Sequence, residues 1–307
     1  MEFREELESL KEQLRFSETF DVPQSSKNIA IAGMGGSGIA AKLFQELYSD
    51  VPIYTIDDYS APSFIGDDTL FIALSYSGNT EETLAALEDA KRRGARTAAI
   101  TSGGKLESMA EQVVKIPKGL QPRSALGYML MPMIRAFGVF SEPDIGEAYD
   151  LLKGIDGKND GERRMAEEIA SGNCIPVIYG IAPYRPVAYR WKTQFNENAK
   201  ILAYSSSFPE LNHNDTMALR DTYRKDEFYF IVLSNERRHE TMRRVPITER
   251  ITNTEFRIVS AEGVSELSRM LGLVHRGDYV SYHLAGLMNR DPKDVGCIED
   301  LKRELDK

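Results

Sequence analysis

The sequence predicts an α/β protein made of two parallel sheets, each flanked by helices in a three-layer arrangement. Short apolar runs alternate with helix-compatible segments over residues 28–117, and the alternation starts again near residue 175. Such alternation is typical of parallel strands joined by helical crossovers. A polar, glycine-rich segment, 154–160, separates the two halves. We therefore expect two domains, residues 1–153 and 154–307.

Length and charge narrow the class of protein. The 307 residues are enough for two domains that each bury a core. The net charge of −9, from 38 basic and 47 acidic side chains without a basic tract, argues against nucleic acid or an anionic membrane as the main partner. The charged N-terminus lacks the apolar core of a signal peptide, and no apolar run approaches the roughly 20 residues of a membrane span. We expect a cytoplasmic enzyme or binding protein.

The sequence gives no reason to expect a metal site. The two cysteines, Cys174 and Cys297, have no metal-ligand spacing and do not indicate a disulfide. Paired histidines at ligand spacing and dense sets of Asp, Glu and His are also missing from the sequence. We therefore expect a reaction or a binding event that needs no bound metal.

The first half opens with an amphipathic helix, because Leu7, Leu10 and Leu14 recur at helical spacing within residues 2–16. The strands that follow are short apolar runs, as expected for strands covered on both faces. The expected strands are 28–32, 52–56, 69–74, 95–100 and 113–117. The expected helices begin near residue 40, at residue 81, after Gly104 and at about residue 125, the last running to about residue 140.

The second half repeats this pattern after two helices. Its strands are again apolar and short, and longer segments with helical spacing separate them. The expected helices are 143–153, 160–171, 184–202, 263–271 and 278–290. The expected strands are 175–180, 228–234 and 256–260.

One stretch of the first half has the composition of an anion site. The expected strand 69–74 runs directly into Ser75, Ser77 and Thr80 around Gly78, and a helix follows. Hydroxyl groups, unpaired backbone N–H groups and the positive end of a helix dipole would then meet at one spot, which favours a phosphate. The alternative is ordinary helix capping and turn formation, since these residue types also favour such positions.

Glycine-rich turns follow two other expected strands. Residues 33–38 form a GxGGxG pattern between a strand and a helix, and Asp57 and Asp58 follow the next strand. This combination keeps a dinucleotide site open, although the pattern alone is weak. A second hydroxyl-glycine cluster stands at 101–104. Because ligands bind at the carboxyl ends of parallel strands, the coincidence of these clusters is more informative than any one of them.

These motifs resemble those of a known family. Ser75–Thr83 is similar to the signature loop of SIS (sugar isomerase) domains, which bind phosphosugars, and residues 33–38 are similar to their first loop. In the second half, 191–200, 208–215 and the segment from Asp291 to Lys302 resemble the bifunctional phosphoglucose/phosphomannose isomerases. The resemblance covers nearly the whole chain, and it implies two SIS domains that isomerise hexose 6-phosphates without a cofactor.

The resemblance also implies roles for particular residues. Arg123 would lie beside C1 and C2 of the sugar, and Glu197 would be the catalytic base. His213 and Lys302 would assist ring opening, with His213 contributed by the neighbouring subunit of a homodimer. The phosphate would be bound by the hydroxyl residues and the first loop, namely Ser37, Ser75, Ser77 and Thr80 with Gly35 and Gly36.

The chemistry of an aldose–ketose isomerisation is compatible with these residue types. A base must move a proton between C1 and C2, a cation must stabilise the enediolate oxyanion, and an acid–base pair must open the ring. A guanidinium stabilises an oxyanion without losing its proton, and a histidine titrates near neutral pH. Without the resemblance, Glu197, Arg123 and Lys302 could equally be solvated surface charges, and His213 could be a turn residue.

Some choices stay open at this stage. The family's C-terminal threonine, which is tied to the acceptance of mannose, is absent, because no threonine follows Thr254. The preference between glucose and mannose epimers is therefore undetermined. A phosphosugar-sensing SIS regulator, a dinucleotide-dependent oxidoreductase and an isomerase of another phosphosugar remain alternatives.

Overall fold

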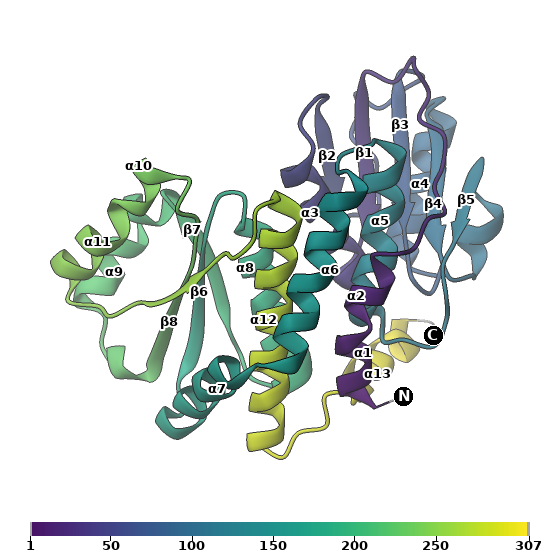
Figure 1. Cartoon of the computed structure of the whole chain (residues 1–307). Coiled ribbons are helices and arrows are strands. Elements are labelled where there is room, and N and C mark those ends of the chain that lie inside the picture. Colours follow the sequence, from purple (N-terminus) through teal and green to yellow (C-terminus); the bar gives the residue numbers. More distant parts are fainter. Residues whose placement is uncertain (1, 306–307) are drawn as a thin grey trace. The chain divides into compact units, whose positions relative to one another are not determined.

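The computed structural model describes residues 2–305 and contains two compact units, each with its own sheet (Figure 1). The N-terminal unit comprises Glu8–Lys153 and Gly263–Ser268. The C-terminal unit comprises the chain up to Leu7, Gly154–Glu262 and the chain from Arg269 onward. The predicted α/β class with two parallel sheets flanked by helices is confirmed. No helix within residues 2–305 is long and apolar enough to cross a membrane.

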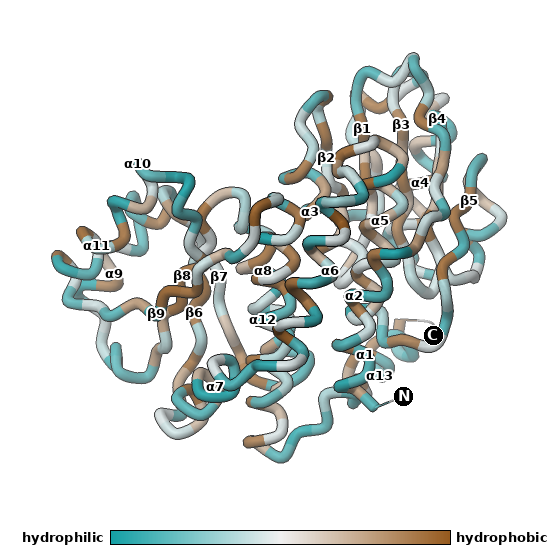
Figure 2. Tube along the Cα trace, in the orientation of Figure 1, coloured by the Kyte–Doolittle hydropathy of each residue, from teal (hydrophilic) through white to brown (hydrophobic). Residues whose placement is uncertain are grey.

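The sheet of the N-terminal unit has the strand order β2-β1-β3-β4-β5, and all of its pairs are parallel. All six residues of β3 are buried, as the apolar sequence pattern predicts, and Figure 2 shows the hydrophobic character of β1 and β3. The pairing sets Gly33 at the end of β1 opposite Leu74 at the end of β3. The strands are β1 (Asn28–Gly33), β2 (Ile53–Ile56), β3 (Thr69–Leu74), β4 (Arg96–Thr101) and β5 (Gln112–Lys115).

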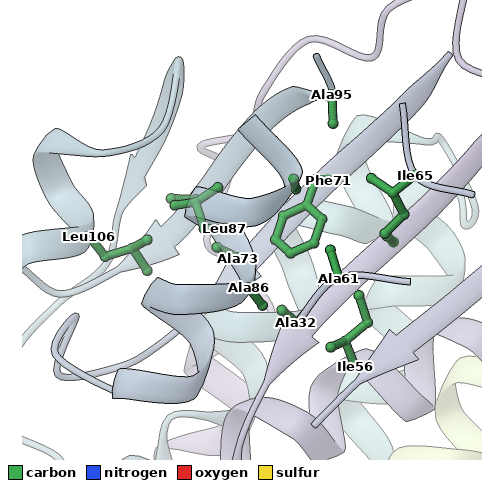
Figure 3. Close-up of a cluster of buried hydrophobic side chains, with 13 residues drawn as sticks. Ala32, Ile56, Ala61, Ile65, Phe71, Ala73, Ala86, Leu87, Ala95 and Leu106 are labelled. Atoms are coloured by element: carbon green, nitrogen blue, oxygen red, sulfur yellow. The ribbon is translucent and has the colours of Figure 1, made fainter. Parts of the chain in front are cut away.

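Helices pack on this sheet through small and branched side chains. Phe71 and Ala73 of β3 meet Ala86 and Leu87 of α4 in a buried cluster on one face (Figure 3). Burial of these side chains stabilises the fold by about 25 cal/mol per Å² of apolar surface removed from water. The helices of this part of the chain are α2 (Leu10–Gln13), α3 (Gly35–Leu47), α4 (Glu81–Arg92), η1 (Lys105–Ser108), η2 (Pro122–Ser124), α5 (Leu126–Ala136) and α6 (Glu142–Gly157).

The sheet of the C-terminal unit has the strand order β7-β6-β8-β9, again entirely parallel. Its core is aromatic: the ring of Tyr179 lies edge-on to those of Phe208 and Phe256, with centroids 6.0 and 5.9 Å apart. The strands are β6 (Ile175–Ile181), β7 (Tyr204–Phe208), β8 (Phe228–Ser234) and β9 (Arg257–Ser260). The helices are α1 (Phe3–Glu8), α7 (Asp160–Gly172), α8 (Arg185–Gln194), η3 (Phe195–Ala199), η4 (Glu210–His213), α9 (Asp215–Asp221), η5 (Lys225–Glu227), α10 (His239–Met242), α11 (Arg244–Thr252), α12 (Glu266–Leu287) and α13 (Gly296–Leu305).

A buried ion pair joins α8 to α12. Arg190 donates to both carboxylate oxygens of Asp278, at 3.1 and 2.8 Å, and both side chains are almost fully buried. Gln194 donates to the same carboxylate at 3.0 Å. The helices also approach closely at Gly277, where a Cβ atom would lie 2.3 Å from the indole nitrogen of Trp191. Asp278 is therefore the polar centre of an otherwise apolar helix interface.

Several expected boundaries are wrong. The helix expected over 143–153 does not end before the polar segment 154–160, because α6 continues to Gly157. Asp156 accepts hydrogen bonds from Tyr279 at 2.8 Å and is 2.7 Å from the imidazole nitrogen of His275, and these contacts hold the helix despite its glycines. The expected helices 263–271 and 278–290 are one helix, α12, since Gly277 is accommodated by its contact with Trp191.

Other elements are shorter than expected or were not foreseen. The expected helix after Gly104 is only the 3-10 helix η1, and the helix expected at 125–140 ends at Ala136, before Gly138 in the left-handed region. The serine-rich strand β7 has too few apolar residues to be recognised, and it pairs with β6 through its backbone. The short helices α9, α10 and α11 likewise lack a strong apolar period.

Replacement of the carboxylate at the polar centre tests its importance. Asp278→Ala would leave the buried Arg190 guanidinium without its carboxylate partner, and we expect the free energy of unfolding to fall by about 3–5 kcal/mol. Urea denaturation followed by circular dichroism measures this change. The matched control is Asp221→Ala, which removes an exposed partner of Arg220 and should leave the unfolding midpoint unchanged. Equal unfolding free energies of the two variants would contradict the role of Asp278 as the partner of a buried charge.

Candidate functional site

The loop between β3 and α4 is held by its own hydroxyl groups. The Ser75 and Thr80 hydroxyl oxygens are 2.8 Å apart, and Ser75 Oγ accepts from the Gly78 N–H at 3.0 Å. Thr80 occupies the N-cap position of α4 but makes no side-chain cap to that helix. Its hydroxyl is used inside the loop, so simple capping does not account for it. Ser75 is buried, whereas Ser77 is exposed at the start of the helix.

A second loop braces the first one. A Cβ atom on Gly78 would lie 1.7 Å from the Gly103 carbonyl oxygen, and one on Gly104 would lie 2.4 Å from the Ser77 carbonyl oxygen. Both glycines have positive φ, +71° and +72°. The Leu106 N–H also donates to the Gly78 carbonyl at 2.9 Å. The hydroxyl-glycine cluster at 101–104 therefore packs against the Ser75–Thr80 loop and supports it.

The glycine-rich turn after β1 is equally compact. A Cβ atom on Gly38 would lie 2.6 Å from the Gly33 carbonyl oxygen, so α3 begins in direct contact with the end of its own strand. Ser37 is buried in the first turn of α3. The acidic residues that kept a dinucleotide site open have local partners: Asp57 pairs with Lys42 at 3.1 Å, and Asp58 accepts from the Tyr59 N–H.

The structure brings Arg123 to this same turn. Arg123 lies in the 3-10 helix η2 and is only 3% exposed. A Cβ atom on Gly36 would lie 2.8 Å from the Arg123 Cα atom, so only glycine permits the approach. Tyr76 links the other loop to the segment before η2, because its hydroxyl oxygen accepts from the Leu120 N–H at 3.0 Å. The two loops and the buried cation therefore form one connected region of the N-terminal unit.

The electrostatics of this region favour an anion. The helices α3 and α4 both begin at this edge of the sheet, since Gly33 and Leu74 are paired neighbours. Each helix start presents backbone N–H groups and the positive end of a dipole. A guanidinium that is almost fully buried adds a permanent positive charge. A phosphate with an attached polar chain has the charge and the acceptor oxygens that this region can bind.

In the C-terminal unit, Glu197 lies on an irregular turn. The helix predicted over 184–202 ends at Gln194, and one turn of π-helix, η3, follows. Such turns are frequent at functional sites. Glu197 is half-buried in this turn, while its neighbour Asn198 is buried and donates to the Ser281 hydroxyl at 2.9 Å. The π-turn aims Glu197 differently from the continuous helix that the sequence predicts.

Lys200 closes the same turn. It has a left-handed backbone, with φ of 60°, and its ammonium donates to the Glu197 carbonyl at 2.5 Å. The same ammonium donates to the Asp294 carbonyl at 2.8 Å. The main chain of the Glu197 turn is thus tied to the segment that leads into α13. A cation at the carbonyl end of a helical turn is also electrostatically favourable.

His213 ends the 3-10 helix η4 and is exposed. Its polar neighbours Asn212 and Asn214 form their hydrogen bonds with other residues. Asn212 donates to the Thr248 hydroxyl at 2.8 Å, and Asn214 accepts from the Asp215 N–H at 2.6 Å. These bonds hold the loop and cap α9, and within residues 2–305 they leave the imidazole of His213 without a hydrogen bond.

Lys302 lies on the exposed helix α13, whose apolar side chains Ile298, Leu301 and Leu305 are also exposed. Glu197, His213 and Lys302 therefore belong to three different elements of the C-terminal unit. Neither His213 nor Lys302 is hydrogen-bonded to Glu197 in the described part of the chain. The structure brings the expected phosphate residues and Arg123 together, but it does not do so for these three residues. Among residues 2–305, no group of His, Cys, Asp and Glu side chains could hold a metal ion.

Two family profiles match the chain. Residues 24–131 match the SIS domain, and residues 158–305 match the bacterial phospho-glucose isomerase C-terminal SIS domain. The bifunctional phosphoglucose/phosphomannose isomerase of Thermoplasma acidophilum is 55% identical over 99% of this chain and 98% of its own length. The protein of the same name from Thermoplasma volcanium is 53% identical over 99% of this chain and 100% of its own length. This chain belongs to the bifunctional phosphoglucose/phosphomannose isomerase family.

More distant structures share the fold of this family member. The C-terminal domain of glucosamine-fructose-6-phosphate aminotransferase from Francisella tularensis superposes with a TM-score of 0.68 at 18% identity, over 94% of this chain and 95% of that chain. At this identity the likeness concerns the architecture alone. It agrees with the two α/β domains that the repeated alternation of strands and helices predicts.

Sequence reasoning missed residues that support the candidate site through their contacts with its loops and turns. Tyr76 was not among the predicted site residues, yet its hydroxyl joins two loops. Lys200 had no local signal beyond its place after the Asn-Glu-Asn-Ala segment. Gln13 was one polar position of an amphipathic helix, although it is fully buried. The sequence signal for Gln13 was its position as a polar residue on the apolar side of a predicted helix.

The bracing of the Ser75–Thr80 loop can be tested at Gly78. Gly78→Ala would force a Cβ atom onto the Gly103 carbonyl and would require a left-handed alanine. We expect the dissociation constant for fructose 6-phosphate, measured by calorimetry, to rise by about tenfold or more. Gly146→Ala in α6 is the control, because nothing lies within 4 Å of its added Cβ atom. Unchanged affinity in Gly78→Ala would contradict a role for this loop.

Proposed function

We propose that this chain interconverts glucose 6-phosphate, and mannose 6-phosphate, with fructose 6-phosphate through an enediolate. The observation that carries the proposal is the buried Arg123 against Gly36, next to the preorganised Ser75–Thr80 loop. The substrate carries a phosphate group and develops an oxyanion during the reaction. The phosphate needs an anion-binding loop, and the oxyanion needs a separate fixed cation. The membership of an isomerase family over the full chain supports the same reaction.

The first half of the chain, residues 1–153, would hold the phosphate. In this proposal Ser37, Ser75, Ser77 and Thr80 donate to its oxygens, and Gly35 and Gly36 let the main chain approach. The hydrogen bond between Ser75 and Thr80 holds both hydroxyls in the loop, and the hydroxyl that donates in this bond would turn its proton to the phosphate on binding. The N-termini of α3 and α4 contribute their dipoles to the same anion.

The second half, residues 154–307, would supply the base. Glu197 removes the proton from C2 of the open-chain aldose and returns it to C1, while the hydroxyl proton moves from O2 to O1. Arg123 stabilises the negative charge that develops on the enediolate oxygens and keeps its own proton. The half-buried setting of Glu197 supports this role, since the carboxylate is partly shielded from water and still has an exposed surface.

His213 and Lys302 would open the hexose ring by transferring a proton between the ring oxygen and the O1 hydroxyl. The exposed imidazole of His213 supports a homodimer in which each His213 completes the site of the partner subunit. Hexose phosphates are charged and do not cross membranes freely, so the enzyme would act in the cytoplasm. No metal or cofactor takes part in this scheme.

A coupled assay in the presence of a chelator tests the activity directly. Glucose 6-phosphate and mannose 6-phosphate are offered separately, and the formation of fructose 6-phosphate is followed for each. Turnover of either substrate supports the proposal, and the ratio gives the epimer preference that the absent C-terminal threonine leaves open. Tight binding of these sugars without turnover would favour a phosphosugar-sensing regulator instead.

The base is tested by Glu197→Gln, which keeps the shape of the side chain but removes the basic carboxylate. We expect kcat to fall by about a thousandfold with little change in the affinity for the phosphosugar. Glu167→Gln, an exposed residue of α7, is the matched control and should keep full activity. Near-normal turnover in Glu197→Gln would exclude the assignment of the base.

Subunit complementation tests the shared site. The variants Glu197→Gln and His213→Ala are each expected to be inactive, but a heterodimer of the two has one site with both residues intact. Random mixing in equal amounts after unfolding and refolding should restore about a quarter of the wild-type activity. The restored activity is measured against each variant refolded alone. Activity that stays at the level of the parent variants would show that His213 serves its own subunit.

A further inference from the structure

We infer that Gln13, at the end of α2, is a positioning residue that holds Arg123 in place for the isomerisation. This inference rests on the proposed role of Arg123 as the cation that faces the enediolate. Gln13 is fully buried in the N-terminal unit and lies 110 positions before Arg123 in the chain. Within the proposed reaction, Gln13 would not touch the substrate.

Every hydrogen-bonding group of the Gln13 amide has a partner. The nitrogen donates to the Ser124 carbonyl at 2.7 Å and to the Ser9 hydroxyl at 3.0 Å. The oxygen accepts from the N–H groups of Gly127 at 2.9 Å and Tyr128 at 3.3 Å. A primary amide has two N–H donors and two acceptor lone pairs, so its capacity is fully used.

Three of these four bonds go to the segment that carries Arg123. Ser124 directly follows Arg123 in η2, and α5 begins two residues later. The N-cap residue of α5 is Ala125, which has no side chain that could satisfy the first N–H groups of the helix. Gln13 performs this capping from a distant part of the chain, and it holds the carbonyl next to Arg123 at the same time.

Gly36 lies against the main chain of Arg123 and restricts its position. Its added Cβ atom would lie 2.8 Å from the Arg123 Cα atom and 3.1 Å from the Pro122 carbonyl oxygen. The main chain of Arg123 is therefore confined between the start of α3 and the Gln13 amide. Gln13 also packs closely against the start of α5, because a Cβ atom added to Gly127 would lie 2.6 Å from the Gln13 Cβ atom.

Packing alone does not require a polar residue at this position. Leu7, Leu10 and Leu14 already supply the apolar face of the N-terminal helices, and all three are buried. A buried amide is costly unless all its bonds are made, and it then favours one arrangement of its partners. Such selection matters for a group that must meet a transition state, since a shift of about 1 Å can cost about a hundredfold in rate.

Gln13→Glu separates the two functions of the amide. The carboxylate keeps the size of the side chain and can still accept from the Gly127 and Tyr128 N–H groups. It no longer offers an N–H to the Ser124 carbonyl, so the hydrogen bond that holds the Arg123 segment is lost. We expect kcat for fructose 6-phosphate formation to fall by roughly 10-fold to 100-fold, while KM changes by less than about threefold.

The matched control is Gln45→Glu in α3. Gln45 also donates its amide N–H to a main-chain carbonyl, that of Ile53 at 2.7 Å, but this bond lies away from the Arg123 segment. We expect its kcat to equal that of the wild type. If Gln13→Glu fails to fold by its melting curve, Gln13→Met replaces it, because methionine has a similar length and removes the whole amide, both the donor to Ser124 and the acceptor for Gly127 and Tyr128.

A double-mutant cycle decides between positioning and general structural support. In an Arg123→Met background, Gln13→Glu should cause no further loss of kcat, because the group that Gln13 positions is already absent. An equal loss in both backgrounds, or an unchanged kcat in Gln13→Glu beside an active wild type, would overturn the inference. The proposed function fails separately, through a wild-type protein that does not turn over hexose phosphates.

Discussion

The parallel pairing of β1 with β3 is the constraint on which the proposed phosphate site depends. It sets Gly33 opposite Leu74, so the loops that leave these strands begin side by side and the helices α3 and α4 start at the same edge. Neither loop could supply two helix N-termini to one anion by itself. The register of two buried strands, fixed by apolar packing, thus determines where a charged group can bind.

The loops at this edge are rigid because backbone contacts leave no space for side chains. Gly78 and Gly36 are each in contact with main-chain atoms of another loop, and Tyr76 and Gln13 add hydrogen bonds from buried side chains. The C-terminal unit uses a different device, in which the Lys200 ammonium closes a π-turn around Glu197. The proposed phosphate site and the proposed base would thus depend on different kinds of local structure, a fixed electrostatic field for the phosphate and an oriented carboxylate for the base.

The errors in the predicted fold have a common physical cause. Glycines at 154 and 157 and at 277 suggested breaks, yet α6 and α12 continue through them. Asp156 and Trp191 make tertiary contacts there that outweigh the helix cost of about 1 kcal/mol per glycine. Local propensity cannot reveal a tertiary partner that is remote in the chain, whereas strand β7 was missed because its serine-rich sequence has too few apolar residues.

The sequence by itself determined the α/β class, the family and the candidate residues of the site, because hydrophobic periodicity and short motifs are local properties. It also indicated that Ser75 and Thr80 belong together, since five positions separate them. Only the tertiary structure decided that Thr80 bonds to Ser75 instead of capping α4, that Arg123 is buried against Gly36, and that Glu197 lies on a π-turn. The burial of Arg123 depends on a contact between segments remote in the chain, and in all three cases packing selects one arrangement from several that the local sequence permits.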